Sequence, residues 1–216
     1  REIADEFSTH DRPRWVLGSL GPGTKLPTLG HTTYEKLKDA YATASDGLIA
    51  GGSDALLVET TQDLLQAKAA VNGARDAISR SKKDIVLIAQ VTVETTGTML
   101  MGSEIGAALN ALEPIGIDLI GLNCATGPAE MSEHLRVLSK CATVGISVMP
   151  NAGLPVLSDG GAHYPLAPLE LAAALKTFVK DYKVNLVGGC CSTTPAHMKE
   201  VVLALSNTKV SGREFI

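Results

Sequence analysis

The chain has 216 residues, of which 45% are hydrophobic, and its formal net charge is -4 at neutral pH. This length is sufficient for one large domain with a substantial core. The weakly acidic charge gives no reason to expect a nucleic acid or a membrane surface as a partner, and no apolar run reaches the roughly 18 residues of a spanning helix. Without an evident secretory signal, the four cysteines predict a cytoplasmic protein with metal-binding or buried thiols rather than a disulfide scaffold.

The two ends of the sequence differ from the segments between them. The first residues, REIADEF, resemble the tail of a helix, and residues 206–216 are polar without an apolar period. We therefore expect residues 1–205 to form part of a larger domain whose first units are missing, and residues 206–216 to be a linker towards a following domain.

Short apolar runs alternate with segments of helical periodicity along the chain. The predicted strands are 15–20, 55–59, 85–91, 118–124, 144–149 and 185–189. The predicted helices are 32–50, 63–79, 103–112, 128–140, 169–182 and 195–205. Thr32 and Glu35 would form a capping box at the first of these helices, and Thr194 and Pro195 would begin the last one. His197, on that last helix, is predicted to face solvent.

This alternation, without hairpin signals, predicts a parallel sheet with right-handed crossovers. Repeats of about 30 to 40 residues are typical of a barrel that needs about 250 residues in all. We therefore predict an α/β fold, a (β/α)8 TIM-type barrel with about six of its eight strand-helix units present. A doubly wound open sheet is the alternative, but no Gly-x-Gly-x-x-Gly segment follows a strand to indicate dinucleotide binding.

Two adjacent cysteines, Cys190 and Cys191, follow a pair of glycines at the end of the last predicted strand. Neighbouring residues form a disulfide only under strain, because the bond requires Cα atoms about 5.5 Å apart. The two cysteines are therefore either buried structural thiols or two-thirds of a metal site.

The active site of such a barrel lies at the carboxyl ends of its strands. The residues predicted there are Ser19, Glu59, the 92–96 region with Glu94, Asn123, Cys124, Asn151, Cys190 and Cys191. Cys124 ends the strand two before that of Cys190, so three thiols would share the rim, with Asn151 between them. Three thiolates and an open fourth position are typical of catalytic zinc, whereas inert buried cysteines are the alternative.

Three segments that contain these residues, GLNCATGP, VMPNAGLP and VGGCCSTTPAHM, resemble the signature segments of the homocysteine-binding S-methyltransferase family. Two others, LGSLGPGTKLPTLGHTTY and VTVETTGTMLMGSEIGAAL, are closer still to its cobalamin-dependent, methionine-forming bacterial members. The resemblance covers nearly the whole chain. It implies a zinc barrel in which Cys124, Cys190 and Cys191 bind the metal. The homocysteine sulfur would take the open position, which Asn151 can occupy without substrate.

The resemblance also implies that Glu59 holds the amino group of homocysteine. Position at the strand ends makes Ser19, Asn123 and Glu94 further candidates for substrate binding. For Asn123 an equal alternative is that it orients the loop through bonds to the backbone, and Glu59 has the alternative of a charged residue that faces water.

The implied reaction is methyl transfer to homocysteine, giving methionine. A free thiol has a pKa near 8.5, and coordination to Zn²⁺ replaces its proton and presents the reactive thiolate. The methyl group would come from methylcobalamin, and originally from 5-methyltetrahydrofolate. The cobalamin and folate domains would belong to the same full-length chain.

Three other functions stay open. The first is a homocysteine S-methyltransferase that uses betaine or S-methylmethionine. The second is a Schiff-base barrel lyase, although no strand end supplies the lysine. The third is a non-catalytic, zinc-stabilised scaffold fragment.

Two features depart from the family pattern. Ser192 stands where the family usually has glycine, and a positive φ there would add strain of about 1 kcal/mol. The family's glycine-rich first strand with its Asp-Gly motif, which helps to form the homocysteine pocket, is not in this sequence.

Overall fold

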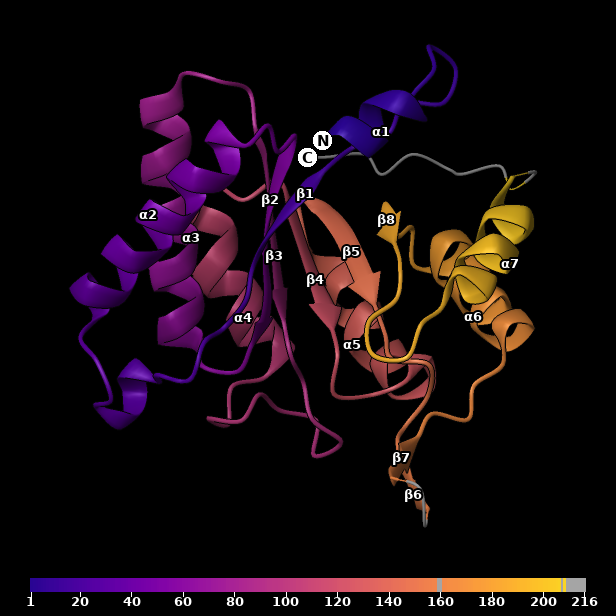
Figure 1. Cartoon of the computed structure of the whole chain (residues 1–216). Coiled ribbons are helices and arrows are strands. Elements are labelled where there is room, and N and C mark those ends of the chain that lie inside the picture. The colour runs from indigo at the N-terminus through magenta and orange to yellow at the C-terminus, as the bar shows by residue number, and fades with distance from the viewer. Residues whose placement is uncertain (159–160, 207, 209–216) are drawn as a thin grey trace.

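The computed structural model describes residues 1–158, 161–206 and 208. Its centre is a curled sheet of six strands in the order β1-β2-β3-β4-β5-β8, and every neighbouring pair is parallel. These strands are β1 (Leu17–Leu20), β2 (Ala55–Thr61), β3 (Val86–Val91), β4 (Leu119–Asn123), β5 (Gly145–Met149) and β8 (Leu186–Val187). The predicted alternation is confirmed, and β1 and β8 are the two edges of an open half-barrel (Figure 1).

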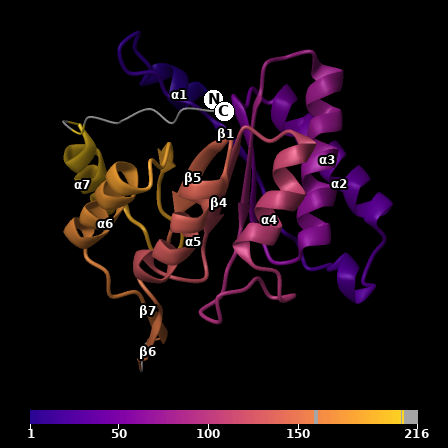
Figure 2. The ribbon, with the colours of Figure 1, turned by 180° about the vertical axis from the view of Figure 1, so that it is seen from behind.

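A helix follows each of these strands, and the helices cover the outer face of the sheet, as Figures 1 and 2 show from opposite sides. They are α2 (Tyr34–Ala50), α3 (Leu64–Ser81), α4 (Ile105–Leu112), α5 (Pro128–Cys141), α6 (Pro168–Asp181) and α7 (Pro195–Leu205). The short helices are α1 (Glu2–Glu6) and the 3₁₀ turns η1 (Pro27–Leu29) and η2 (Glu113–Ile115). In the described part of the chain, no helix is both long and apolar enough to cross a bilayer.

The main core lies between the outer face of the sheet and these helices. Leu56, Leu87 and Leu122 point outwards from β2, β3 and β4 and are at most 1% exposed. They pack among buried side chains of the helices, such as Val71 of α3. Burial of each leucine contributes about 1.5–3 kcal/mol, so this layer holds the half-barrel together although the sheet does not close.

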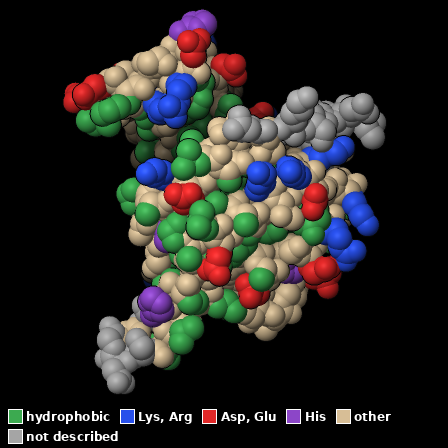
Figure 3. All heavy atoms as spheres, turned by 90° about the vertical axis from the view of Figure 1, so that its right-hand side faces the viewer, with side chains coloured by type: hydrophobic (Ala, Val, Ile, Leu, Met, Phe, Trp, Pro, Cys, Tyr) green, Lys and Arg blue, Asp and Glu red, His purple; other side chains and the backbone are tan. Residues whose placement is uncertain are grey.

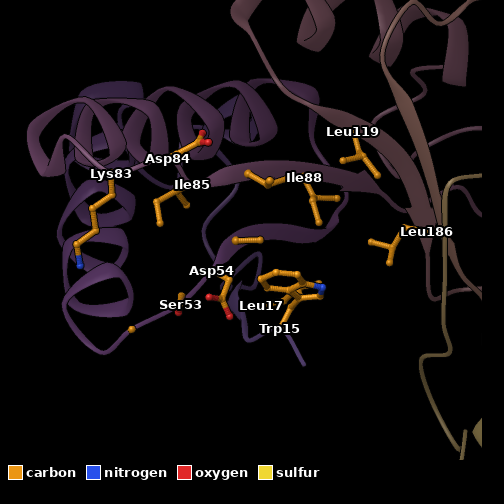
Figure 4. Close-up of a pocket in the computed structure, with 13 residues that line it drawn as sticks. Trp15, Leu17, Ser53, Asp54, Lys83, Asp84, Ile85, Ile88, Leu119 and Leu186 are labelled. Carbon is orange, nitrogen blue, oxygen red and sulfur yellow. The ribbon is translucent and has the colours of Figure 1, made fainter. Parts of the chain in front are cut away.

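The inner face of the sheet is apolar at one end and polar at the other. Near the amino ends of the strands, Leu17, Leu119 and Leu186 line an open hollow of about 610 Å³ (Figure 4). Because side chains alternate between the two faces, Ser19 and Asn123 lie on the same face as Leu17 and Leu119, nearer the carboxyl ends. The polar end is therefore the rim at which the sequence places the candidate site residues.

One side of the molecule carries exposed apolar residues next to the β8 edge. Val202 and Leu203 of α7 are 54% and 57% exposed. A second hollow of about 670 Å³ lies beside them, lined also by Val187 and Val201. Figure 3 shows this side, where hydrophobic side chains lie among charged ones. Both hollows flank the open side of the half-barrel.

Two sequence predictions about helix starts are wrong. The cap of α2 is Thr33, whose Oγ1 accepts from the Lys36 N–H at 3.3 Å, rather than Thr32. His197, which was predicted to face solvent, is buried. Both of its ring nitrogens have partners: Nδ1 accepts from the Thr194 N–H at 3.2 Å, and Nε2 donates to the Leu166 carbonyl at 3.0 Å. The histidine thus completes the N-terminal cap of α7, for which Thr194 was predicted as the cap residue.

The long loop after β5 contains an antiparallel hairpin that the sequence analysis missed. Its strands are β6 (Val156–Ser158) and β7 (Gly161–His163). The hairpin projects from the body of the molecule (Figure 1), and Leu157 is 86% exposed. The predicted linker, residues 206–216, lies outside the described residues except for Ser206 and Thr208.

Candidate metal centre

Three cysteine side chains meet at the carboxyl ends of β4 and β8. Cys124 directly follows β4, and Cys190 and Cys191 follow β8. Their sulfur atoms all lie within 4.8 Å of one another, and the Cys124 and Cys191 sulfurs are 3.8 Å apart. Strand β5 lies between β4 and β8 in the sheet, so the two cysteine-bearing loops meet across the end of a single strand.

Backbone hydrogen bonds hold both loops on the end of β5. The N–H of Cys124 donates to the Met149 carbonyl at 3.2 Å, and the N–H of Cys190 donates to the Pro150 carbonyl at 2.8 Å. Cys124 has a φ of 61°, a left-handed conformation that is uncommon for residues other than glycine. Such conformations persist only where the surrounding structure fixes them, which indicates a preorganised position for the thiol.

Ser192 also has a φ of 61°. The condition under which serine would add strain at this position is therefore met. Gly189, three residues earlier, has a different requirement, because a Cβ there would lie 2.3 Å from the Thr193 side chain. The turn after β8 thus needs one glycine for space, while its left-handed position carries a serine.

Asn151 lies between the cysteine loops, where its side chain is only 2% exposed. Its Oδ1 accepts from the Cys191 N–H at 3.0 Å, and the side chain also forms a hydrogen bond with Cys124. Asn151 therefore contacts both halves of the thiol cluster, which is the place that the sequence analysis expected for it.

The three thiols do not ionise alike. A hydrogen bond from Cys190 stabilises the Cys124 thiolate and lowers the pKa of Cys124 to about 5. The same hydrogen bond, together with burial, raises the pKa of Cys190 above its usual value. Burial, followed by the charge of Cys124, raises the pKa of Cys191. Without a metal, the cluster at neutral pH is thus one thiolate beside two thiols.

A carboxylate stands beside the cluster. Glu59, at the end of β2, accepts a hydrogen bond from the Ser19 hydroxyl at 2.5 Å and another from Asn123 Nδ2 at 3.3 Å. Asn123 Nδ2 lies 3.8 Å from the Cys190 sulfur. The structure therefore brings Ser19, Glu59 and Asn123 together with the thiols, as expected from their positions at the strand ends.

Glu94 does not join this group. Its backbone bonds to Thr98 and Gly97 close a turn after β3, and within the described residues its carboxylate makes no hydrogen bond to the cluster. The sequence reasoning also missed Tyr164, which follows β7 and contacts Cys191. Burial and the neighbouring thiols raise the pKa of its phenol. Tyr164 directly follows the hairpin, for which the Asp159-Gly160 pair between the two strands was an available sequence signal.

The cluster fits a tetrahedral soft-metal ion. Zinc–sulfur bonds of about 2.3 Å in a tetrahedron place two sulfurs about 3.8 Å apart, and the Cys124 and Cys191 sulfurs have this separation. The described residues offer three sulfur ligands at this site, which leaves a fourth position for another donor. Three protein ligands with an open position are typical of catalytic rather than structural zinc.

Comparison with known proteins gives the family. The homocysteine S-methyltransferase family matches residues 1–205. The chain belongs to this family. It is 63% identical to the methionine synthase of Mycobacterium tuberculosis over 214 residues, which is 99% of this chain and 18% of that protein. It is also 63% identical to the methionine synthase of Mycobacterium leprae over 206 residues, 95% of this chain and 17% of that protein.

Solved structures support the fold of the family. The homocysteine methyltransferase MmuM from Escherichia coli, in its apo form, superposes with a TM-score of 0.70 at 20% identity, over 89% of this chain and 64% of that one. Its metallated form gives a TM-score of 0.67 at 18% identity, over 93% and 64%. The chain spans less than a fifth of the length of the methionine synthases that it matches. The sequence-based recognition of this family is confirmed.

Proposed function

We propose that this chain is the homocysteine-activating part of a cobalamin-dependent methionine synthase, in which Cys124, Cys190 and Cys191 hold a zinc ion. The observation that carries the proposal is the group of three sulfurs within 4.8 Å of one another on the barrel rim. The 63% identity to two methionine synthases supports the cobalamin-dependent branch of the family.

Zinc would supply a Lewis acid that holds the substrate sulfur as a thiolate at neutral pH. The residues around it would bind and orient homocysteine. Glu59 presents a half-buried carboxylate on the side of the cluster, where it would accept hydrogen bonds from the substrate ammonium group. Ser19 and Asn123 fix its two oxygens. Asn151, already beside Cys124 and Cys191, is the side chain that would give way to the incoming sulfur.

Methyl transfer to that sulfur would give methionine. Cobalamin and the folate that supplies its methyl group would be bound by other domains of a longer chain, since this chain corresponds to 18% of its M. tuberculosis relative. The site would then open towards a separate, mobile donor.

We also propose that two further strand-helix units complete the barrel between β8 and β1. Six parallel strands with two unpaired edges are two short of an eight-stranded barrel. Unpaired strand edges and large exposed apolar patches are usually covered in native proteins. The two hollows that flank the open side, of about 610 and 670 Å³, are the surfaces that these units would cover.

The test is a methyl-transfer assay with the full-length protein, zinc and homocysteine. Methylcobalamin or methyltetrahydrofolate with cobalamin should yield methionine, whereas betaine and S-methylmethionine without cobalamin should not. Transfer from betaine or S-methylmethionine alone would show that the donor assignment is wrong while the zinc and homocysteine parts stand. A folded, zinc-free protein that still forms methionine would contradict the proposed role of the metal.

A further inference from the structure

Asn123 connects the carboxylate of Glu59 to the thiol cluster. It is the last residue of β4, only 1% exposed, and its side chain crosses to the end of β2. Its Oδ1 accepts from the Thr60 N–H at 2.7 Å, and its Nδ2 lies 2.8 Å from Thr60 Oγ1. The same Nδ2 lies 3.3 Å from Glu59 Oε2 and 3.8 Å from the Cys190 sulfur. One buried amide thus contacts backbone, carboxylate and thiol together.

The backbone that Asn123 binds is strained. Thr60 has a φ of 57°, which is an outlier for a β-branched residue and costs about 1–3 kcal/mol. The pairing of β2 with β3 also shifts register between Val58 and Thr61. Asn123 stabilises this irregular backbone by accepting the Thr60 N–H, and Glu59 directly precedes Thr60 in the chain.

We propose that Asn123 is a positioning residue that holds the Glu59 carboxylate at a fixed separation from the Cys190 sulfur, so that the site selects thiols with an α-amino group four bonds from the sulfur. This inference rests on the proposed function. Asn123 Nδ2 lies 3.3 Å from Glu59 Oε2 and 3.8 Å from the Cys190 sulfur, so the same amide nitrogen keeps the carboxylate oxygen and the sulfur close to each other. Ser19 holds the other oxygen, which fixes the carboxylate from both sides.

The carboxylate has room for a substrate. An ionised carboxyl group offers about four lone-pair sites, and hydrogen bonds from Ser19 and Asn123 occupy two of them. The free sites would accept the ammonium group. A charge-assisted hydrogen bond of this kind corresponds to about a 10- to 100-fold gain in affinity, which a thiol without the amino group forgoes.

The experiment compares two thiols on the cobalt-substituted full-length protein, in which sulfur-to-Co²⁺ charge-transfer absorption reports binding without turnover. Homocysteine is titrated against 4-mercaptobutanoate, which has the same chain and carboxylate but lacks the amino group. The native protein should prefer homocysteine by about 10-fold or more. Asn123→Ala should reduce this preference to about threefold or less, by weakening homocysteine binding, while cobalt content and 4-mercaptobutanoate binding stay at native levels.

Asn185→Ala is the matched control. Asn185 Oδ1 likewise accepts a backbone N–H of the neighbouring strand, from Ile146 at 2.9 Å, at the opposite end of the sheet. This variant should lose stability but keep the native preference. Should Asn123→Ala fail to fold, Asn123→Ala combined with Thr60→Gly replaces it, since glycine adopts a positive φ without strain. That double variant should fold and still lack the preference.

The outcomes separate the two proposals. A folded Asn123 variant that binds cobalt and retains the native preference would overturn the positioning role and leave the proposed function intact. A native, cobalt-loaded protein whose absorption does not change with either thiol would contradict the proposed function itself.

Discussion

The two ends of the inner face of the half-barrel differ in nearly every property that is used to recognise a site. The end near the amino termini of the strands has a hollow of about 610 Å³ lined by Leu17, Leu119 and Leu186, and it resembles a ligand pocket. The opposite rim has a cluster of thiols, a carboxylate and buried amides. A large apolar cavity with few polar groups is the default site hypothesis for an uncharacterised protein. Here the direction of the strands identifies the other end.

The difference shows that an apolar hollow can be a surface that another part of the protein covers, rather than a ligand-binding site. In the hollow near the amino ends of the strands, Leu17, Leu119 and Leu186 are inward-facing side chains of an open sheet, and residues of the preceding loops, such as Asp54 and Lys83, line it as well (Figure 4). In a closed barrel such positions are filled by side chains from all eight strands. The rim, in contrast, has polar groups that partner one another, strained backbone at Thr60, Cys124 and Ser192, and a strongly lowered pKa at Cys124. Strain and perturbed pKa values cluster at functional sites.

The largest expected effect is the loss of metal from the rim. Cys124→Ala in the full-length protein should lower zinc content from about one ion per chain to near zero, because two thiolates and weak donors do not retain the ion. Elemental analysis of protein purified without chelator measures this. Cys141→Ala is the matched control, since Cys141 is an exposed free cysteine at the end of α5.

Leu186→Ser tests the other end of the comparison. Leu186 lines the hollow near the amino ends of the strands, and its substitution should leave the zinc content at one ion per chain. A folded Leu186→Ser protein without zinc would contradict the conclusion that the hollow and the metal site are independent of each other.

The next effect concerns substrate affinity. Glu59→Gln keeps the size of the side chain but removes its charge, and it should weaken homocysteine binding about 10- to 100-fold. Calorimetric titration of the zinc-loaded protein measures this. Zinc content should not change, because Glu59 is not one of the three clustered residues that we propose as ligands. Unchanged homocysteine affinity in this variant would remove Glu59 from the substrate site.

Much of this arrangement follows from the sequence. The alternation of apolar runs and helical periods predicts the parallel order, and consecutive neighbours in the sheet then place Cys124 two strands from Cys190, as the structure shows. What the sequence does not contain is the local geometry. Thr60 is β-branched and has no propensity for a positive φ, so this conformation and the contact with Asn123 arise from tertiary packing.

Other misses have equally local causes. Thr32 and Thr33 are both plausible caps, and only the start of α2 at Tyr34 decides between them. His197 is buried because the Leu166 carbonyl returns to it from a loop 31 residues earlier, a contact that helical periodicity cannot show. The β6–β7 hairpin has a sequence signal that was overlooked, because Asp159-Gly160 stands between its two strands and Asp-Gly is typical of a hairpin turn. Tyr164, which directly follows β7, was missed together with it.

The ionisation of the thiols gives a prediction about protons. The pKa of Cys124 is about 5, so its side chain is a thiolate at pH 7. The pKa values of Cys190 and Cys191 are raised, so both side chains stay protonated at that pH. Zinc binding requires all three as thiolates, so it should release about two protons per ion. Calorimetry in buffers of different ionisation enthalpy counts them. Release of three protons would show that Cys124 is not ionised beforehand.

The same ionisation fixes the sign of a pH effect. In the metal-free protein, alkylation of Cys124 should be fast above pH 5 and slow below it, because only the thiolate reacts. Release of a third proton on zinc binding should appear only as the pH falls through about 5, where Cys124 becomes protonated.

The smallest expected effect is at Ser192. Ser192→Gly should raise the free energy of unfolding by about 1 kcal/mol, because glycine adopts the φ of 61° without the penalty of a Cβ. Denaturant unfolding of the full-length protein measures it. Ser206→Gly is the control, since Ser206 has a φ of -54°, where glycine has no such advantage. A destabilised Ser192→Gly protein would show that the serine side chain contributes a contact that outweighs the strain.

X-ray absorption at the zinc edge tests the central claim most directly. The account predicts three sulfur ligands at about 2.3 Å and one lighter ligand in the substrate-free protein, and four sulfur ligands after homocysteine is added. A sulfur count that does not change with homocysteine, or a site with four sulfurs from the start, would contradict an open thiolate site on this rim.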